Sequence, residues 1–186
     1  SLTLDSTTNY SATVTGDAAN NTLVMEGVLS GNVDMGGGDD NITIDLDTAT
    51  YTGTLDGAAG SDTLTLNSDS SDQTILTTSY SNIENLDMTG DTIFTLQGTS
   101  TYDDISAGGS TDVVIASGAN ITAANSFDGD SGVNDLTVEG DLIADVDLSS
   151  GDDTMTIDLD TGSYTGSADG GLSLIHISEP TRQWQI

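Results

Sequence analysis

Carboxylates are the side chains with which this sequence could do chemistry, and many of them occupy one recurring place. An Asp-Asp pair stands directly before an apolar run at 39–40 and again at 152–153, and Asp62 takes the same place before a third run. Ca²⁺ prefers carboxylate and carbonyl oxygens, so turns of this kind could bind calcium where they stack on one another. Two alternatives to a calcium site remain open. The acids could be ordinary turn residues, or their charge could be screened by diffuse counterions without an ordered site. The candidate calcium ligands are Asp39, Asp40, Asp62, Asp152 and Asp153 at the turns, with Asp45, Asp47, Asp158 and Asp160 on the segments that follow.

The side chains that most catalytic mechanisms require are missing from residues 1–171. Residues 1–171 contain no His, Lys, Arg or Cys, which removes Ser-His-Asp triads, thiolate nucleophiles and Schiff bases. Two carboxylates alone can hydrolyse a glycoside, so a glycan-acting enzyme built on the Asp pairs at 39–40, 103–104 or 152–153 stays an alternative. We expect no catalysis, because Asp in solvent-facing turns is far commoner than Asp in a catalytic pair.

The charge balance excludes several partners. The 186 residues carry a formal net charge of −30 with only one Lys or Arg. Nucleic acid and anionic membrane surfaces are bound through clusters of Lys and Arg, so neither is expected as a partner. Bound cations would relieve the self-repulsion of such a chain. No apolar run approaches the roughly 20 residues of a membrane-spanning helix, and no Cys is present to form a disulfide.

The segments that must position these acids alternate between apolar and polar residues. In ITIDLD, residues 42–47, every second residue is Ile or Leu and the others are Thr or Asp; TLTL at 63–66 behaves in the same way. A period of two predicts β-strands with one buried side. Gly, Asp and Asn, which favour turns, separate these strands, and no comparable segment has the period of a helix.

The sequence repeats itself over a long and a short period. Residues 38–58 match residues 151–171 at 14 of 21 positions, and the similarity extends upstream, so that 16–58 recurs as 129–171. A turn followed by an alternating strand returns about every 19–22 residues, the size of one solenoid coil, although this register is poorest from 103 to 134. We therefore predict an all-β fold, a parallel β-helix (β-solenoid) with coils of about 20 residues. Its interior is predicted to contain one row of Leu23, Ile42, Leu64, Leu136 and Met155.

Two motifs carry a resemblance to a family of secreted proteins. GAAGSDTLTL at 57–66 and IENLDMTG at 83–90 resemble the β-strand repeats of bacterial autotransporter passengers and related surface adhesins. The resemblance implies a right-handed parallel β-helix in an extracellular location or on the bacterial outer surface, where it serves as a stalk or an adhesive shaft. It also implies a surface as partner, namely a host cell, a glycan or an extracellular matrix.

A second resemblance is to the calcium-binding nonapeptides of RTX proteins, which follow the pattern G-G-x-G-x-D-x-U-x. GAAGSDTLT at 57–65 matches this pattern at Gly57, Gly60, Asp62 and Leu64, with Ala58 in place of its second Gly. In that family successive nonapeptides share calcium ions between turns, whereas here the motif occurs once per coil. The resemblance implies a calcium-binding repeat module as the alternative to an adhesive shaft.

The last fifteen residues differ in composition from everything before them. The only His, Pro, Arg and Trp of the chain all lie within 172–186. LSLIHISEPTR at 172–182 resembles the translation of a transposon-type adapter used in DNA sequencing libraries. This implies two parts, a β-solenoid fragment at 1–171 and a non-native tail at 172–186. We then expect the natural protein to continue beyond Gly171, so that further coils of the parent chain would be direct partners of this segment.

The function predicted from these observations is a structural or adhesive shaft of a secreted or surface-displayed bacterial protein. Tyr51 and Tyr164, which are equivalent in the long repeat, would either stack on glycans or cover the edge of a coil. An ice-binding solenoid is a further alternative, because the hydroxyls of stacked Thr-x-Thr strands would form a regular array. The Thr-x-Thr pairs in question are Thr13/Thr15, Thr63/Thr65 and Thr154/Thr156.

Overall fold

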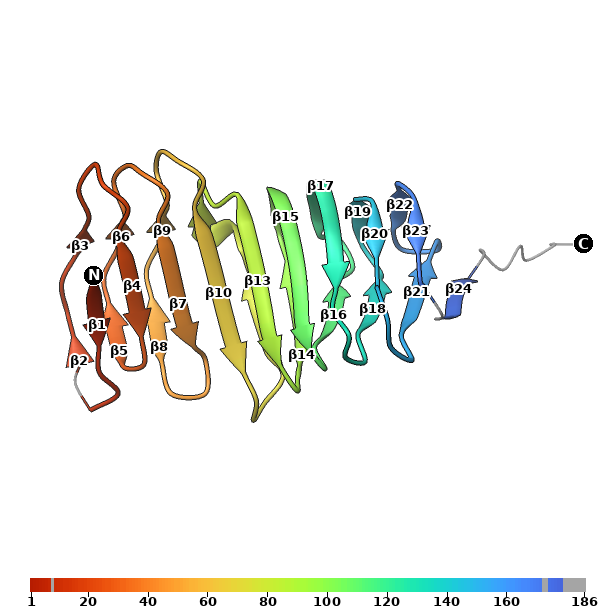
Figure 1. Ribbon diagram of the computed structural model, residues 1–186, viewed down its shortest axis with the longest axis horizontal. Helices are drawn as coiled ribbons and strands as arrows, with labels where there is room; N and C mark the ends of the chain where they lie inside the picture. Colours follow the sequence, from red (N-terminus) through yellow and green to blue (C-terminus); the bar gives the residue numbers. More distant parts are fainter. Residues whose placement is uncertain (8, 172–173, 179–186) are drawn as a thin grey trace, which may run out of the picture.

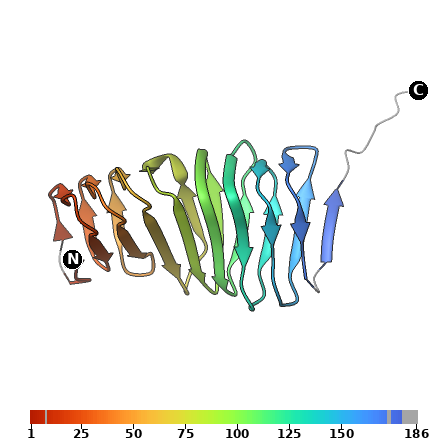
Figure 2. The same ribbon diagram turned by 45° about the horizontal axis from the view of Figure 1, so that its top comes forward.

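The computed structural model describes residues 1–7, 9–171 and 174–178, the last segment as backbone only. Its strands wind through about eight turns, each about 21 residues long, and form an elongated stack that begins at the N-terminus (Figures 1 and 2). The strand pairings are parallel and join one turn to the next. The predicted all-β parallel β-helix is therefore confirmed. In the described part of the chain, the one helical segment is the short 3-10 turn η1 (Thr77–Ser79), and no helix is long and apolar enough to cross a membrane.

Each coil passes through three faces in turn. The first face contains β1 (Leu2–Leu4), β4 (Thr22–Met25), β7 (Asn41–Asp45), β10 (Thr63–Ser68), β13 (Asn85–Gly90), the second halves of β15 (Thr99–Gly109) and β17 (Asn120–Gly129), β20 (Val146–Asp147) and β23 (Ala168–Asp169). The second face contains β2 (Asn9–Tyr10), β5 (Val28–Ser30), β8 (Thr50–Thr52), β11 (Gln73–Leu76), β14 (Ile93–Gln97), β16 (Asp112–Ile115), β18 (Asp135–Val138), β21 (Thr154–Asp158) and β24 (Leu174–Ser178). The third face contains β3 (Val14–Thr15), β6 (Val33–Asp34), β9 (Leu55–Asp56), β12 (Tyr80–Ser81), the first halves of β15 and β17, β19 (Asp141–Ile143) and β22 (Ser163–Thr165).

The alternation of the sequence decides which side chains enter the core. Leu23, Ile42 and Leu64 pair in register on the first face and are at most 1% exposed. Leu136 and Met155 are equally buried, but they pair with each other on the second face. The predicted single interior row is therefore wrong, because its five residues belong to two rows on different faces.

The long repeat explains this division. Its two copies lie 113 residues apart, which is about five coils and one further face. As a result, β4 on the first face and β18 on the second occupy the same place in the repeat, and so do β7 and β21. The two copies of the repeat thus form strands on two different faces, because a strand on either face requires the same alternation of buried and exposed residues.

Two long strands lie in the stretch where the sequence register is poorest. β15 and β17 both run from the third face onto the first without a break. Their mutual pairing shifts by one residue between Tyr102 and Asp104. At this corner both Tyr102 and Ile105 point into the core, so two buried residues three positions apart interrupt the period of two. The extra residue of the bulge lies in β17, where Ala123 and Phe127 are buried four positions apart. A corner of this kind has no turn residues to mark it in the sequence.

Candidate functional site

Asp40 and Asp62 lie one coil apart, at the corner where the chain enters the first face. Oδ1 of Asp40 accepts the backbone N–H of Asn21 at 2.6 Å, and Oδ1 of Asp62 accepts the backbone N–H of Asp40 at 2.8 Å. Glu84 continues the series, because its Oε2 accepts the backbone N–H of Asp62 at 2.8 Å. Each of these carboxylates therefore satisfies a backbone donor of the preceding coil, just before the regular ladder of the first face begins.

Asp39 lies on the outer side of the same corner and connects coils in the other direction. Its Oδ1 accepts the backbone N–H of Ser61, in the following coil, at 3.0 Å. Its own backbone N–H donates to Oδ1 of Asn20, in the preceding coil, also at 3.0 Å. Asp39 and Asp40 together thus bind their own coil to both of its neighbours.

Asp152 and Asp153 belong to a different corner, where the chain enters the second face. Asp153 is buried and its Oδ1 accepts the backbone N–H of Asn134 at 2.8 Å, while Asp152 is exposed. The capping bond is the same as at the first-face corner, because the long repeat carries the sequence from one face to the next. The structure therefore brings Asp39, Asp40 and Asp62 together and leaves the pair at 152–153 elsewhere.

Across residues 1–7, 9–171 and 174–178, no group of three or more acidic or His side chains is arranged to hold a metal ion. One oxygen of each of Asp39, Asp40, Asp62 and Asp153 is already bound to a backbone N–H of a neighbouring coil. Calcium binding at the predicted residues stays a prediction based on the family resemblance.

The inner corner also holds carboxylate oxygens that lack a partner. Asp40 and Asp62 are at most 2% exposed, and Oδ2 of each is buried without a hydrogen bond within the described residues. Burial raises the pKa of Asp62, the N–H bond from Asp40 opposes this, and the charges of Asp40, Glu84 and Asp39 raise the pKa further. Burial is thus the main reason why the pKa of Asp62 is raised, and the neighbouring acids add to it.

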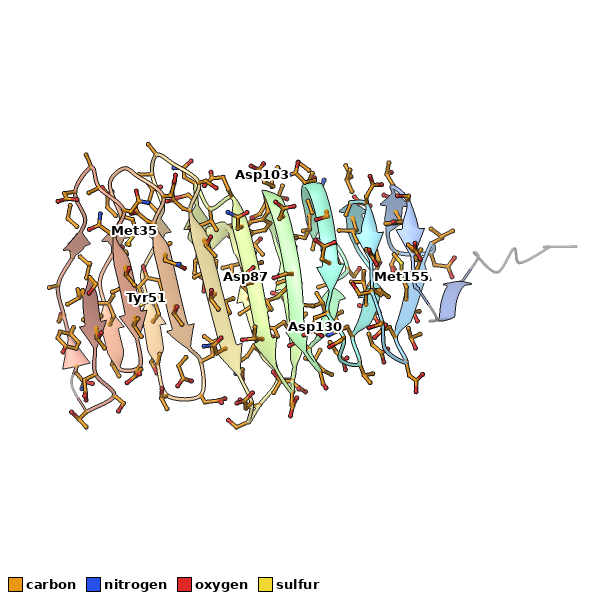
Figure 3. The ribbon with its side chains drawn as sticks, in the orientation of Figure 1. Met35, Tyr51, Asp87, Asp103, Asp130 and Met155 are labelled. Carbon is orange, nitrogen blue, oxygen red and sulfur yellow. The ribbon has the colours of Figure 1, made fainter. Side chains whose placement is uncertain are left out.

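The acids on the strands act within turns. Oδ1 of Asp45 accepts the backbone N–H of Asp47 at 3.1 Å, and Asp158 makes the equivalent bond with Asp160 at 2.9 Å. Asp47 also reaches the next coil, where its carboxylate accepts the hydroxyl of Ser70 at 2.6 Å and the backbone N–H of residue 69 at 2.8 Å. The Ser70 hydroxyl is the main cause that lowers the pKa of Asp47. Acidic residues on the outer side of the strands behave likewise, as at Asp87, whose Oδ1 accepts the Ser106 hydroxyl at 2.7 Å (Figure 3).

The predicted Thr array does not form, because Thr63/Thr65 lie on the first face, Thr154/Thr156 on the second and Thr15 on the third.

Tyr51 and Tyr164 lie on different faces, are half-buried and pack against the core. The Tyr164 hydroxyl donates to the carbonyl oxygen of Ala144 at 3.2 Å. Burial raises the pKa of Tyr51 to about 12. Both rings therefore cover part of the core, and stacking of a glycan on them stays a prediction.

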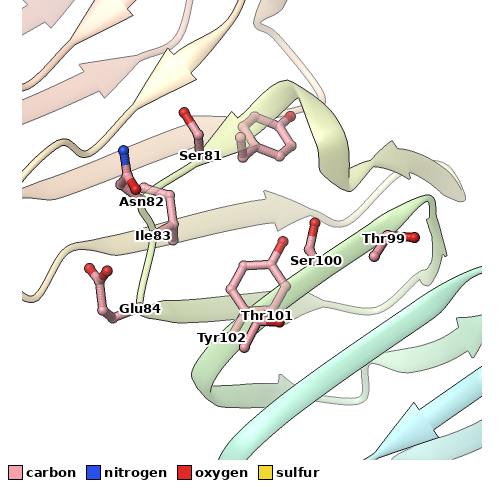
Figure 4. Close-up of a pocket in the computed structure, with 9 residues that line it drawn as sticks. Ser81, Asn82, Ile83, Glu84, Thr99, Ser100, Thr101 and Tyr102 are labelled. Carbon is pink, nitrogen blue, oxygen red and sulfur yellow. The ribbon is translucent and has the colours of Figure 1, made fainter.

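A pocket of about 300 Å³, which the sequence did not predict, opens on the third face beside β12 (Figure 4). It lies between Tyr80–Glu84 in one coil and Thr99–Tyr102 in the next. Most of its lining consists of hydroxyl, phenol, amide and carboxylate groups. One signal in the sequence could have found it, since Ser100 occupies a position that the alternation assigns to an apolar side chain.

No family model, curated protein or solved structure matches this chain. The fold and the two features described above, the capped acidic corners and the polar pocket, are therefore the basis on which a function is inferred.

Proposed function

We propose that residues 1–171 form a rigid structural shaft of a secreted or surface-displayed bacterial protein, and that the segment has no catalytic role. The observation that carries this proposal is the unbroken sheet of the first face. In the described part of the chain it runs from β1 to β23 through successive parallel pairings, without a skipped coil. Parallel coils spaced by about 4.8 Å give eight turns a length of roughly 40 Å.

The carboxylates support the same proposal. At two corners, backbone N–H groups of neighbouring coils donate hydrogen bonds to the carboxylates of Asp39, Asp40, Asp62, Glu84 and Asp153. Charge-assisted bonds of this type are stronger than bonds between neutral groups. These bonds can therefore hold neighbouring coils together without a metal ion, although at Asp62 the burial of the charge opposes part of the gain.

The surroundings of the shaft follow from charge and from the family resemblance. A chain with 31 acidic residues and one Lys or Arg stays soluble and repels other acidic surfaces. Attachment to a host cell, glycan or matrix, a location outside the cell, and further coils that continue the stack are parts of this proposal.

Circular dichroism of the protein in EDTA, followed by a calcium titration, tests the proposal. An unchanged β-signal and an unchanged unfolding midpoint in EDTA would support a metal-independent shaft. A β-signal that appears only with calcium would overturn it and favour the calcium-binding repeat module. The variant Asp62→Asn is a useful control, because it removes one predicted ligand charge and keeps the capping oxygen.

A further inference from the structure

The polar pocket lies on the third face, at the place where one sheet ends at β12 and another begins at the first half of β15. β12 pairs with β9 on one side, and the first half of β15 pairs with β17 on the other. Within the described residues β12 and β15 do not pair with each other, although the same two coils remain paired on the first and second faces. The gap is therefore local, and the coils on either side of it are fixed by the other two faces.

Ser100 provides the space inside this gap. It pairs in register with Ile121, which pairs with Leu142, which pairs with Tyr164. Ile121 and Leu142 are fully buried, so this row points into the core. A serine in place of a large apolar side chain leaves a hollow that is lined by a hydroxyl, and Figure 4 shows Ser100 and Tyr102 pointing into it from the same side of β15.

Tyr102 contributes an unsatisfied polar group. Its side chain is 2% exposed, lines the pocket, and has a hydroxyl that makes no well-formed hydrogen bond to any described residue. Burial raises the pKa of Tyr102 to about 12, and the nearby Ser100 hydroxyl opposes this with a smaller effect. A buried hydroxyl without a well-formed partner is costly, so a ligand group that enters the hollow far enough to reach it would be favoured.

The remaining lining limits the ligand. Glu84 is held in place through the bond from the backbone N–H of Asp62 to its Oε2, and its other oxygen is left as an acceptor. Residues 1–171 contain no Lys, Arg or His to balance an anion. Glu84 is the one carboxylate in the lining, which is too few for a bare metal ion. Tyr80, which is half-buried, adds ring surface of the kind that packs against C–H groups.

We propose that this pocket binds a single neutral sugar ring, such as the end residue of a glycan. Such a ring offers several hydroxyls as donors and acceptors, has an apolar C–H face that can pack against Tyr80, and carries no charge to be repelled. A volume of about 300 Å³ lies at the lower end of small-molecule sites and suits one ring. The inference rests on the proposed shaft, for which it names a partner.

Titrations followed by NMR of the tyrosine ring signals test the proposal on the full chain. The probes are glucose, galactose, mannose and N-acetylglucosamine, with glucuronate, glucosamine and glycerol as anionic, cationic and acyclic controls. We expect at least one neutral sugar to change the chemical shifts of the Tyr80 and Tyr102 rings, with saturation at millimolar sugar. The ring signals of Tyr164 should not change, and glucuronate should change none of these signals. No response to any neutral sugar, an equal response to glycerol, or a response to glucosamine alone would overturn the proposal.

Two variants and one matched control make the test specific. Ser100→Leu fills the hollow with the residue type that the same row has at Leu142, and should abolish the shifts. Thr122→Leu, on the outer side of the next coil, should leave them intact. Tyr102→Phe should weaken sugar binding about tenfold, because it removes a hydroxyl that the sugar would engage. Equal binding by wild type and Tyr102→Phe would contradict the assigned role of this hydroxyl.

This test is independent of the test of the shaft. Ser100→Leu leaves the first face untouched and should give the wild-type β-signal in EDTA. If no sugar binds and the β-signal persists in EDTA, the pocket proposal fails and the shaft proposal stands. If the fold requires calcium, the same titration performed with calcium still reports on the pocket.

Discussion

Oδ1 of Asp62 accepts the backbone N–H of Asp40, 22 residues earlier in the chain, at 2.8 Å. The second oxygen of Asp62, Oδ2, is buried without a hydrogen bond among the described residues and lies against Gly57, where any Cβ would collide with it. One oxygen of the carboxylate thus joins two coils, while the other loses its hydration without compensation. Asp62 is therefore the residue at which charge and architecture conflict most clearly.

Asp62→Asn should make the protein more stable at neutral pH. The amide keeps an oxygen for the N–H of Asp40 and removes the buried charge, and Asn21 already occupies the aligned position two coils earlier. We expect the free energy of unfolding to rise by about 1 kcal/mol. Urea unfolding at pH 7, followed by circular dichroism, measures this change.

The stability gained by Asp62→Asn should decrease as the pH falls. The pKa of Asp62 is raised in the folded protein above its ordinary value of 3.8, chiefly by burial. The cost of ionising Asp62 is therefore complete above the folded pKa and disappears below 3.8. The stability advantage of Asp62→Asn should shrink as the pH falls through this window, and an advantage that grows on acidification would contradict the argument.

Asp145→Asn is the matched control, with the opposite sign. The backbone N–H and then the hydroxyl of Ser167 lower the pKa of the exposed Asp145. The ionised carboxylate therefore stabilises the fold above pH 3.8, and this contribution is lost as the pH falls through the folded pKa. Wild type should be more stable than Asp145→Asn at pH 7, and the two should converge in acid. Equal pH slopes for the Asp62 and Asp145 variants would contradict both assignments.

Gly60→Ala should be strongly destabilising. Gly60 has a φ of +151°, and an added Cβ would press into the carbonyl oxygen of Gly38 in the preceding coil. Backbone crowding that cannot relax costs about 2 kcal/mol or more. Gly37→Ala is the control, since its Cβ would meet the Ala59 carbonyl oxygen at an ordinary 3.6 Å, and its free energy of unfolding should change by less than about 1 kcal/mol. A smaller loss for Gly60→Ala than for Gly37→Ala would contradict the close packing of these corners.

The fold could be predicted because each local signal agrees with it. Alternation in segments such as 42–47 marks strands, and Gly and Asp mark the corners between them. The assignment of strands to faces could not be predicted in the same way. A repeat of 113 residues gives Leu23 and Leu136 the same sequence context, and only the summed coil lengths reveal that they lie on different faces.

The site was predicted only in part. Turn chemistry identified Asp40, Asp62 and Asp153, yet their partners are backbone N–H groups one coil away, and no sequence motif encodes these bonds. The pocket was missed because it depends on one small residue, Ser100, and on a bulge next to Tyr102 that shifts the period of two. Both are departures from a regular pattern, and they can be interpreted only after the coils have been aligned.

Leu86→Ala should reveal how much the narrow core contributes. Leu86 pairs with Leu64 on one side and Ile105 on the other, and it is 0% exposed. Removing a buried Leu side chain from a row that cannot collapse costs about 3 kcal/mol. Leu159→Ala is the control, because this side chain is 38% exposed and should change the free energy of unfolding by about 0.5 kcal/mol or less. Chemical denaturation measures both values, and similar losses for the two variants would contradict the proposed core.

Replacing residues 172–179 by AGSDTLTL, the sequence of residues 59–66, should stabilise the solenoid. The backbone of β24 pairs with β21 through residues 174–178, and the predicted tail also includes 179–186, which lie outside the described residues. In the other copy of the repeat, Asp62 caps the N–H of Asp40 and Leu64 covers Ile42. In β24 Ile175 pairs with Met155, whereas the repeat places position 177 beside Met155, so the replacement requires a register shift of two residues. After that shift, Ile175→Asp and Ile177→Leu would restore this cap and this contact at the end of the stack.

A gain of about 1 kcal/mol would raise the thermal midpoint by roughly 2–4 °C in a chain of this size. Differential scanning calorimetry of the replaced and original chains measures this shift. A third chain with the same eight residues in reverse order is the control, since it has the same composition but places neither the Asp cap nor the Leu contact. An equal gain in the reversed chain, or no gain in the direct one, would mean that residues 172–179 already serve the stack as well as the repeat sequence does. It would thereby argue against a non-native origin of the tail.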